Sequence, residues 1–65
     1  MKKFLYFSAD WCGPCRQLGP TMEEVAKEGI TVQKIDVDRS PEMSQHYGVR
    51  NIPTVILLNE MGEEQ

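Results

Sequence analysis

Trp11-Cys12-Gly13-Pro14-Cys15 contains both cysteines of this 65-residue chain, separated by two residues. The pair follows an apolar run at residues 4–7 and begins a helical pattern, so the first cysteine falls at the N-terminus of a predicted helix. There, unpaired backbone N–H groups and the helix dipole stabilise a thiolate, the nucleophilic form of cysteine. This position favours a reversible dithiol over a disulfide that only stabilises the fold.

Thiol–disulfide exchange requires an attacking thiolate and a second thiol that resolves the mixed disulfide. We predict that Cys12, at the start of the helix, is exposed and acts as the nucleophile. Cys15 lies one turn further along the apolar face and is predicted to be sheltered and to act as the resolving thiol. Gly13 allows a tight entry to the helix, and Pro14 suits an early helical position because no hydrogen bond is lost there. Trp11 is predicted to offer an apolar contact surface to a peptide substrate.

Two other uses of the cysteine pair are less favoured. Structural zinc requires four ligands, but the chain has no second Cys-x-x-Cys and its one histidine, His46, falls in another predicted helix. A purely structural disulfide would close a very small loop and would contribute roughly 2 kcal/mol at most in the chain-entropy formula. No metal site is therefore predicted, and Met22 and Met43 are interpreted as core residues.

Composition limits the class of protein. The length suits a single domain, residues 1–65, which buries only about 60% of the surface that its unfolded chain exposes. The net charge of −3 and the scattered lysines and arginines argue against nucleic acid or an anionic membrane as a partner. No apolar stretch approaches the ~20 residues that span a bilayer, and the N-terminal apolar run is too short for a signal peptide. We therefore expect a cytoplasmic protein, because a reducing compartment suits a chain with two cysteines.

Apolar periodicity predicts three strands and two helices. The strands are expected at residues 4–7, 30–37 and 54–58, and the helices at residues 13–28 and 40–47. Pro20 is expected to kink the first helix, and the Ser40 hydroxyl is expected to cap the second. A strand, a crossover helix and a second strand form a right-handed unit with parallel strands. The pattern thus predicts an α/β sandwich with one helix on each face of the sheet.

The same segments resemble the thioredoxin family. Residues 8–16, Ser-Ala-Asp-Trp-Cys-Gly-Pro-Cys-Arg, are similar to its active-site motif, and Pro20 matches the proline of its active-site helix. Residues 34–38, Lys-Ile-Asp-Val-Asp, look like its lysine-containing strand. Residues 47–54 are similar to its Tyr-Gly-Ile-Arg-x-Ile-Pro-Thr segment, and Gly62 matches its hairpin glycine. The resemblance covers nearly the whole chain.

This resemblance implies a minimal thioredoxin-like β-α-β-α-β domain. Its three-stranded mixed sheet would have the strand order 2-1-3, with the third strand antiparallel. The family's N-terminal strand and helix and its C-terminal strand and helix have no counterpart in residues 1–65. Residues 54–58 would then form an apolar edge, through which we expect self-association.

The implied activity is reduction of protein disulfides, with Cys12 attacking and Cys15 resolving. The redox-active disulfide replaces any cofactor, and a thioredoxin-reductase-like enzyme or a small thiol would recharge it. The resemblance also implies a cis Ile52–Pro53 bond that faces the cysteines, with Ile52, Pro53, Thr54 and Trp11 in contact with substrate. Two alternatives stay open, a thioredoxin-fold binding or assembly module and a thiol redox sensor without multiple turnover.

One position departs from the family pattern. Tyr6 stands where the family usually has a buried aspartate that relays protons to the resolving thiol. A phenol, with an ordinary pKa of about 10, is a poor general base near pH 7. We therefore expect slower resolution by Cys15, or relay through water. Lys34, the family's partner of that aspartate, would lack its carboxylate, and we expect its amine to reach solvent.

Overall fold

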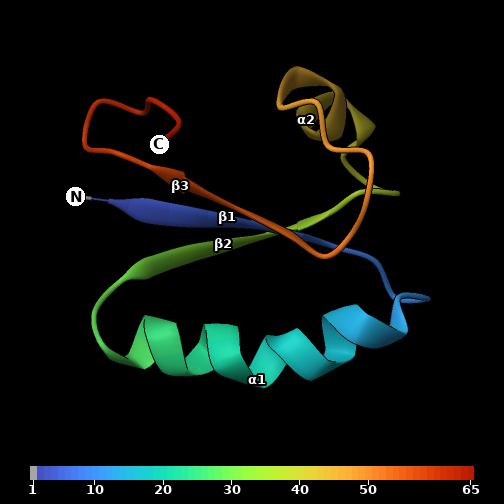
Figure 1. Ribbon diagram of the computed structural model, residues 1–65, viewed down its shortest axis with the longest axis horizontal. Helices are drawn as coiled ribbons and strands as arrows, with labels where there is room; N and C mark the ends of the chain where they lie inside the picture. Colours follow the sequence, from blue (N-terminus) through green and yellow to red (C-terminus); the bar gives the residue numbers. More distant parts are fainter. Residues whose placement is uncertain (1) are drawn as a thin grey trace.

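The computed structural model describes residues 2–65, which form three strands and two helices (Figure 1). In chain order these are β1 (Lys3–Ser8), α1 (Gly13–Lys27), β2 (Thr31–Asp36), α2 (Pro41–His46) and β3 (Thr54–Leu58). The predicted elements are confirmed to within one residue at either end. In the described part of the chain, neither helix is long and apolar enough to cross a membrane.

β1 is the central strand of the sheet, whose order is β2-β1-β3. It runs parallel to β2, with Phe7 opposite Ile35, and antiparallel to β3, with Phe7 opposite Thr54. The predicted strand order and orientation are therefore confirmed. Because parallel strands end at the same edge of a sheet, the loops that follow β1 and β2 lie close together.

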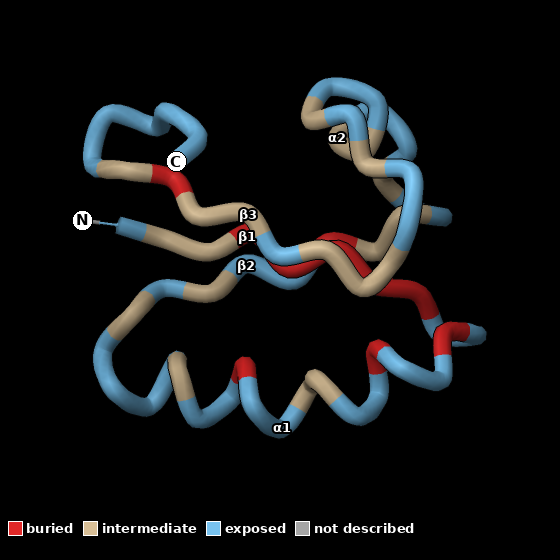
Figure 2. The backbone as a smooth tube through the Cα atoms, in the orientation of Figure 1, coloured by how far each residue is buried: buried red, intermediate tan, exposed pale blue. Residues whose placement is uncertain are grey.

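Successive side chains of β1 serve opposite faces of the sheet. Tyr6 joins the buried cluster beneath α1, which also contains Ala9, Cys12, Cys15 and Met22. On the face that carries α2, the buried cluster consists of Leu5, Phe7, Ile35 and Leu58. Figure 2 shows buried residues in the strands of the sheet and on the side of α1 that faces the sheet. Each helix thus covers one face, as the sequence predicts.

The helix ends follow the sequence signals only in part. α1 runs without a break through Pro20. Gly29, just beyond the end of the helix, takes a positive φ of 92°. The prediction that the Ser40 hydroxyl caps α2 is wrong, since that side chain makes no capping hydrogen bond. The Met43 N–H, which a capping hydroxyl would reach, donates instead to the backbone carbonyl of Ser40 at 3.2 Å.

The chain turns back along β3 after Leu58. Gly62 closes the turn, with a φ of 81° and an N–H that donates to the Asn59 carbonyl at 3.0 Å. The Gln65 N–H then donates to the Leu57 carbonyl at 2.9 Å, and Glu64 bridges Leu58. The prediction that all of residues 54–58 form a free edge is therefore wrong at its C-terminal end. Within β3, it is residues 54–56 that keep an outer side without a strand partner among residues 2–65.

Candidate active site

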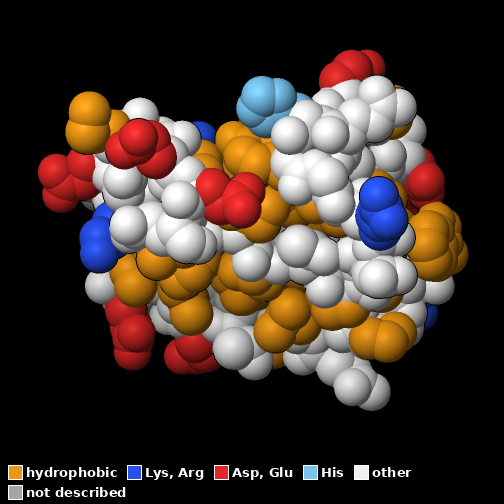
Figure 3. Space-filling model, turned by 45° about the horizontal axis from the view of Figure 1, so that its top comes forward, with side chains coloured by type: hydrophobic (Ala, Val, Ile, Leu, Met, Phe, Trp, Pro, Cys, Tyr) orange, Lys and Arg blue, Asp and Glu red, His pale blue; other side chains and the backbone are white. Residues whose placement is uncertain are grey.

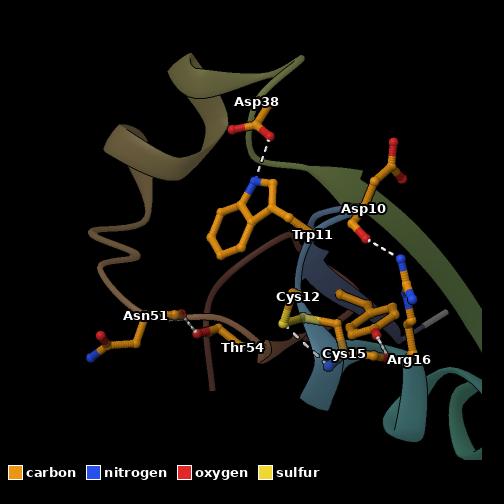
Figure 4. The surroundings of a disulfide bond; sticks show 9 residues. Asp10, Trp11, Cys12, Cys15, Arg16, Asp38, Asn51 and Thr54 are labelled. Carbon is orange, nitrogen blue, oxygen red and sulfur yellow. Dashed lines mark hydrogen bonds between the residues drawn. A yellow bond between two sulfur atoms is a disulfide. The ribbon is translucent and has the colours of Figure 1, made fainter.

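Cys12 and Cys15 form a disulfide at the N-terminus of α1, with their Cα atoms 5.3 Å apart (Figure 4). Cys12 is the N-cap residue, and its Sγ accepts the backbone N–H of Cys15 at 3.2 Å. Such an N–H group stabilises a sulfur that becomes negatively charged. The position of Cys12 on the helix therefore suits it to be the thiolate of the reduced pair.

The prediction that Cys12 is exposed is wrong. Cys12 is only 4% exposed and Cys15 only 3%. The Cys12 N–H donates to the Ala9 carbonyl at 3.1 Å, which folds the loop tightly, and Ile52 packs against the cluster that contains both cysteines. The two thiols therefore differ in their position on the helix rather than in exposure.

Trp11 is fixed beside the disulfide although it is 68% exposed. Its indole Nε1 donates to Oδ2 of Asp38 at 2.8 Å, as Figure 4 shows. Asp38 lies just beyond β2 and is brought to the end of β1 by the parallel pairing. The Arg16 guanidinium, on the first turns of α1, donates to the Asp10 carbonyl at 2.8 Å and holds the loop before Cys12. Sequence reasoning missed Asp38 and Arg16 as site residues, although loops after parallel neighbours are expected to meet.

The Ile52–Pro53 peptide bond is cis, as the resemblance implied. The segment before β3 is fixed by the Thr54 hydroxyl, which donates to the Asn51 carbonyl. Ile52 and Trp11 line one groove of about 340 Å³, whose walls also include Arg50. Pro53 and Thr54 follow Ile52 in the chain but do not line this groove. The structure thus brings together Trp11, Ile52 and the disulfide.

Tyr6 is buried beneath α1, and its hydroxyl donates to the backbone carbonyl of Cys15 at 2.5 Å. Burial raises the pKa of the Tyr6 phenol above its ordinary value. The phenol therefore acts near pH 7 as a hydrogen-bond donor that anchors the first turn of α1. It does not supply the general base that an aspartate would offer.

A cleft of about 460 Å³ opens beside Cys15, between α1 and the sheet. We call it the Cys15 cleft, and its lining includes Tyr6, Ser8, Asp10, Cys15, Glu23 and Lys34. Lys34 is exposed, as expected. The cleft links the buried surroundings of Cys15 to solvent.

Tyr6→Phe is expected to lower the free energy of unfolding at pH 7 by about 1–2 kcal/mol, because a buried carbonyl loses its donor. The difference from wild type should shrink as pH rises above about 10, where the unfolded phenol ionises. Above that pH the Tyr6 phenol is ionised in the unfolded state but still protonated in the folded state, so the free energy of unfolding of the wild type falls. The variant has no phenol at position 6 and is not destabilised in this way. Urea unfolding at several pH values measures both effects. Tyr47→Phe is the matched control, and a difference for Tyr6→Phe that stays constant with pH would contradict the assignment.

Comparisons with known proteins agree with this geometry. The family model described as Thioredoxin matches residues 2–65. A thioredoxin from Rhodospirillum rubrum is 46% identical over 57 residues, which cover 83% of this chain and 55% of that protein. A bifunctional thioredoxin reductase/thioredoxin from Mycobacterium leprae is 50% identical over 54 residues, or 78% of this chain and 12% of that protein.

Among solved structures, a mutant thioredoxin from Halobacterium salinarum NRC-1 superposes with a TM-score of 0.92. It is 42% identical, and the match covers 98% of this chain and 57% of that one. The chain therefore spans little more than half the length of these two thioredoxins.

Proposed function

Because the chain belongs to the thioredoxin family, we propose that it is a protein disulfide reductase working through Cys12 and Cys15. The observation that carries this proposal is the disulfide at the N-terminus of α1, where Cys12 Sγ accepts a backbone N–H. The cis Ile52–Pro53 bond and the groove beside Trp11 support it further. The exchange requires no bound cofactor, since the electrons reside on the two sulfur atoms.

In the proposed cycle, the reduced Cys12 thiolate attacks a disulfide of a protein substrate. A bond forms between Cys12 Sγ and one substrate sulfur, and the other substrate sulfur leaves as a thiolate. Cys15 then loses its proton and attacks Cys12 Sγ, so the mixed disulfide breaks and the Cys12–Cys15 disulfide closes. The substrate receives two electrons and the protein is oxidised.

Substrate contact is proposed for Trp11, Ile52, Pro53 and Thr54. An extended substrate segment would lie in the groove that Trp11 and Ile52 line, where Asp38 holds the indole, and would continue past Pro53 and Thr54, which lie outside that groove. Gly13 and Pro14 support the site by starting α1 directly after Cys12. The four substrate-contacting residues would position the substrate disulfide over the N-terminus of α1.

A reductant must return Cys12 and Cys15 to the dithiol. The Mycobacterium leprae relative, by its name, joins a thioredoxin reductase and a thioredoxin in one chain. We propose that a thioredoxin-reductase-like enzyme or a small thiol recharges this protein. A reducing compartment such as the cytoplasm would suit that cycle.

Reduction of insulin by excess dithiothreitol tests the proposed function. The wild type should accelerate precipitation of the insulin B chain over many turnovers, and the Cys12→Ser, Cys15→Ser double variant should not. A wild type no faster than the double variant would refute the reductase and favour a binding module. Oxidation in a single stoichiometric step, without turnover, would favour a thiol sensor.

We also propose that a second copy pairs along β3. Residues 54–56 have an unpartnered outer side in the described chain, and Val55 is 38% exposed. Figure 3 shows hydrophobic side chains in a band across one face of the molecule. An open apolar strand of this kind is a template for pairing with another chain.

Val55→Lys is expected to weaken this self-association by about tenfold or more, because a charged side chain opposes edge pairing. Sedimentation over a range of concentrations measures the effect. Met61→Lys adds the same charge in the turn beyond β3 and serves as the control. A wild type that stays monomeric at millimolar concentration would refute the interface.

A further inference from the structure

The Cys15 cleft contains a buried hydroxyl without a protein partner. Ser8, the last residue of β1, is 2% exposed, and its Oγ makes no hydrogen bond within residues 2–65. Ser8 lines the Cys15 cleft together with Cys15 itself. Buried polar groups in folded proteins are nearly always bonded to protein or to ordered water. At about 30 Å³ per water molecule the cleft has room for several, so a water at its inner end can supply the partner that the Ser8 hydroxyl lacks.

The resolving step creates a need for such a water. Cys15 has to lose its thiol proton as its sulfur attacks Cys12, although it is almost completely buried. The Tyr6 hydroxyl is committed to the Cys15 carbonyl, and burial raises the pKa of that phenol. The Lys34 ammonium offers only donors. None of these groups accepts a proton at neutral pH.

The cleft also supplies an exit for the proton. Asp10 and Glu23 line it and are exposed, so the cleft opens to bulk solvent beside two acidic residues. A hydroxyl can donate one hydrogen bond and accept another at once. It can therefore orient a bound water molecule so that a lone pair of the water oxygen points away from the hydroxyl. Ser8 is the buried hydroxyl that lines the cleft beside Cys15 and is not already committed.

We propose that Ser8 is a positioning residue whose hydroxyl holds the water that takes the Cys15 proton during resolution. The inference rests on the proposed reductase function and deepens it. The proton passes from Cys15 Sγ to the water held by Ser8 and on to solvent or to the carboxylates at the mouth of the cleft. The sulfur then forms its bond with Cys12 Sγ, and the substrate sulfur leaves with the electron pair of the broken bond.

A symmetrical nitrobenzoate disulfide separates the two steps in a stopped-flow experiment. The reagent is kept below the protein concentration, and its coloured thiolate is released twice. The first release reports attack by Cys12, and the second reports resolution by Cys15. Ser8→Ala is expected to slow the second release by at least about tenfold at pH 7 and to leave the first unchanged. The loss should diminish toward pH 9, where hydroxide from solvent takes over the role of the positioned water.

Two further variants make the result decisive. Ser8→Thr retains a hydroxyl and should recover the second release to within about threefold of wild type. Ser40→Ala removes a serine hydroxyl outside the cleft and should leave both releases unchanged. Ser8→Ala is expected to fold normally, because it deletes a hydroxyl that has no protein partner.

An unchanged second release in Ser8→Ala would overturn the assignment, as would an equal slowing of both releases. If the wild type still reduces insulin over many turnovers in either case, only the role of Ser8 is lost. A wild type that fails to turn over insulin removes the proposed function itself.

Discussion

Cys15→Ser is expected to turn the protein into a covalent trap for its substrates. Cys12 would still attack a substrate disulfide, but no second thiol would resolve the adduct. Turnover of insulin should fall by roughly 10⁴-fold or more, as it does when a member of a catalytic unit is removed. Mass spectrometry should find the substrate thiol attached to the protein.

Cys12→Ser is the matched control for the trap. It removes the sulfur that accepts the Cys15 N–H and leaves only the thiol whose backbone is anchored by Tyr6. Turnover should fall as far as in Cys15→Ser, but no stable adduct should accumulate. Equal adduct formation by the two variants would contradict the assignment of Cys12 as nucleophile.

Phe7→Ala is expected to remove between about a third and nearly all of the free energy of unfolding of the protein. Phe7 is completely buried in the centre of the sheet, where it packs in the cluster beneath α2. Truncating a buried phenylalanine costs about 3–5 kcal/mol, and at 0.05–0.15 kcal/mol per residue a domain of this size has only about 3–10 kcal/mol to lose. The small core leaves no second layer to compensate.

Urea unfolding followed by Trp11 fluorescence or by circular dichroism measures this loss. Met61→Ala, on the exposed turn, is the control and should change the free energy of unfolding by no more than about 0.5 kcal/mol. A loss below about 1 kcal/mol for Phe7→Ala would mean that the core does not depend on this ring.

The elements of the fold were predictable because each carries a local signal. The apolar run of β1, the 3.6-residue periodicity of α1 and the glycines at 29 and 48 define where the elements lie. The strand order and the cis proline bond required the family resemblance, since periodicity alone does not say which strands pair. The partly covered edge of β3 was missed because it depends on the backbone hydrogen bonds of Gln65, which no side-chain pattern encodes.

The candidate site was predictable in its sulfur chemistry and less so in its environment. The sequence placed Cys12 at the start of α1, but its burial depends on Ile52, which lies 40 positions further along the chain. The contacts of Trp11 with Asp38 and of Tyr6 with the Cys15 carbonyl are likewise tertiary. Such contacts form only after the strands have paired, so residue spacing does not reveal them.

The pairing of β1 with β3 also decides how the protein responds to mechanical force. Lys3 lies opposite Leu58, and Gln65 is bonded to Leu57, so both ends of the described chain lie at the same end of the sheet. A pull on these two ends first peels residues 63–65 from β3 and then opens the β1–β3 ladder from that end. The hydrogen bonds between β1 and β3 therefore break one after another, starting at the Lys3–Leu58 pair, instead of all bearing the force together. Such a pull meets low resistance, and it reaches the covalent link between Cys12 and Cys15, at the far end of the sheet, after the β1–β3 ladder has opened.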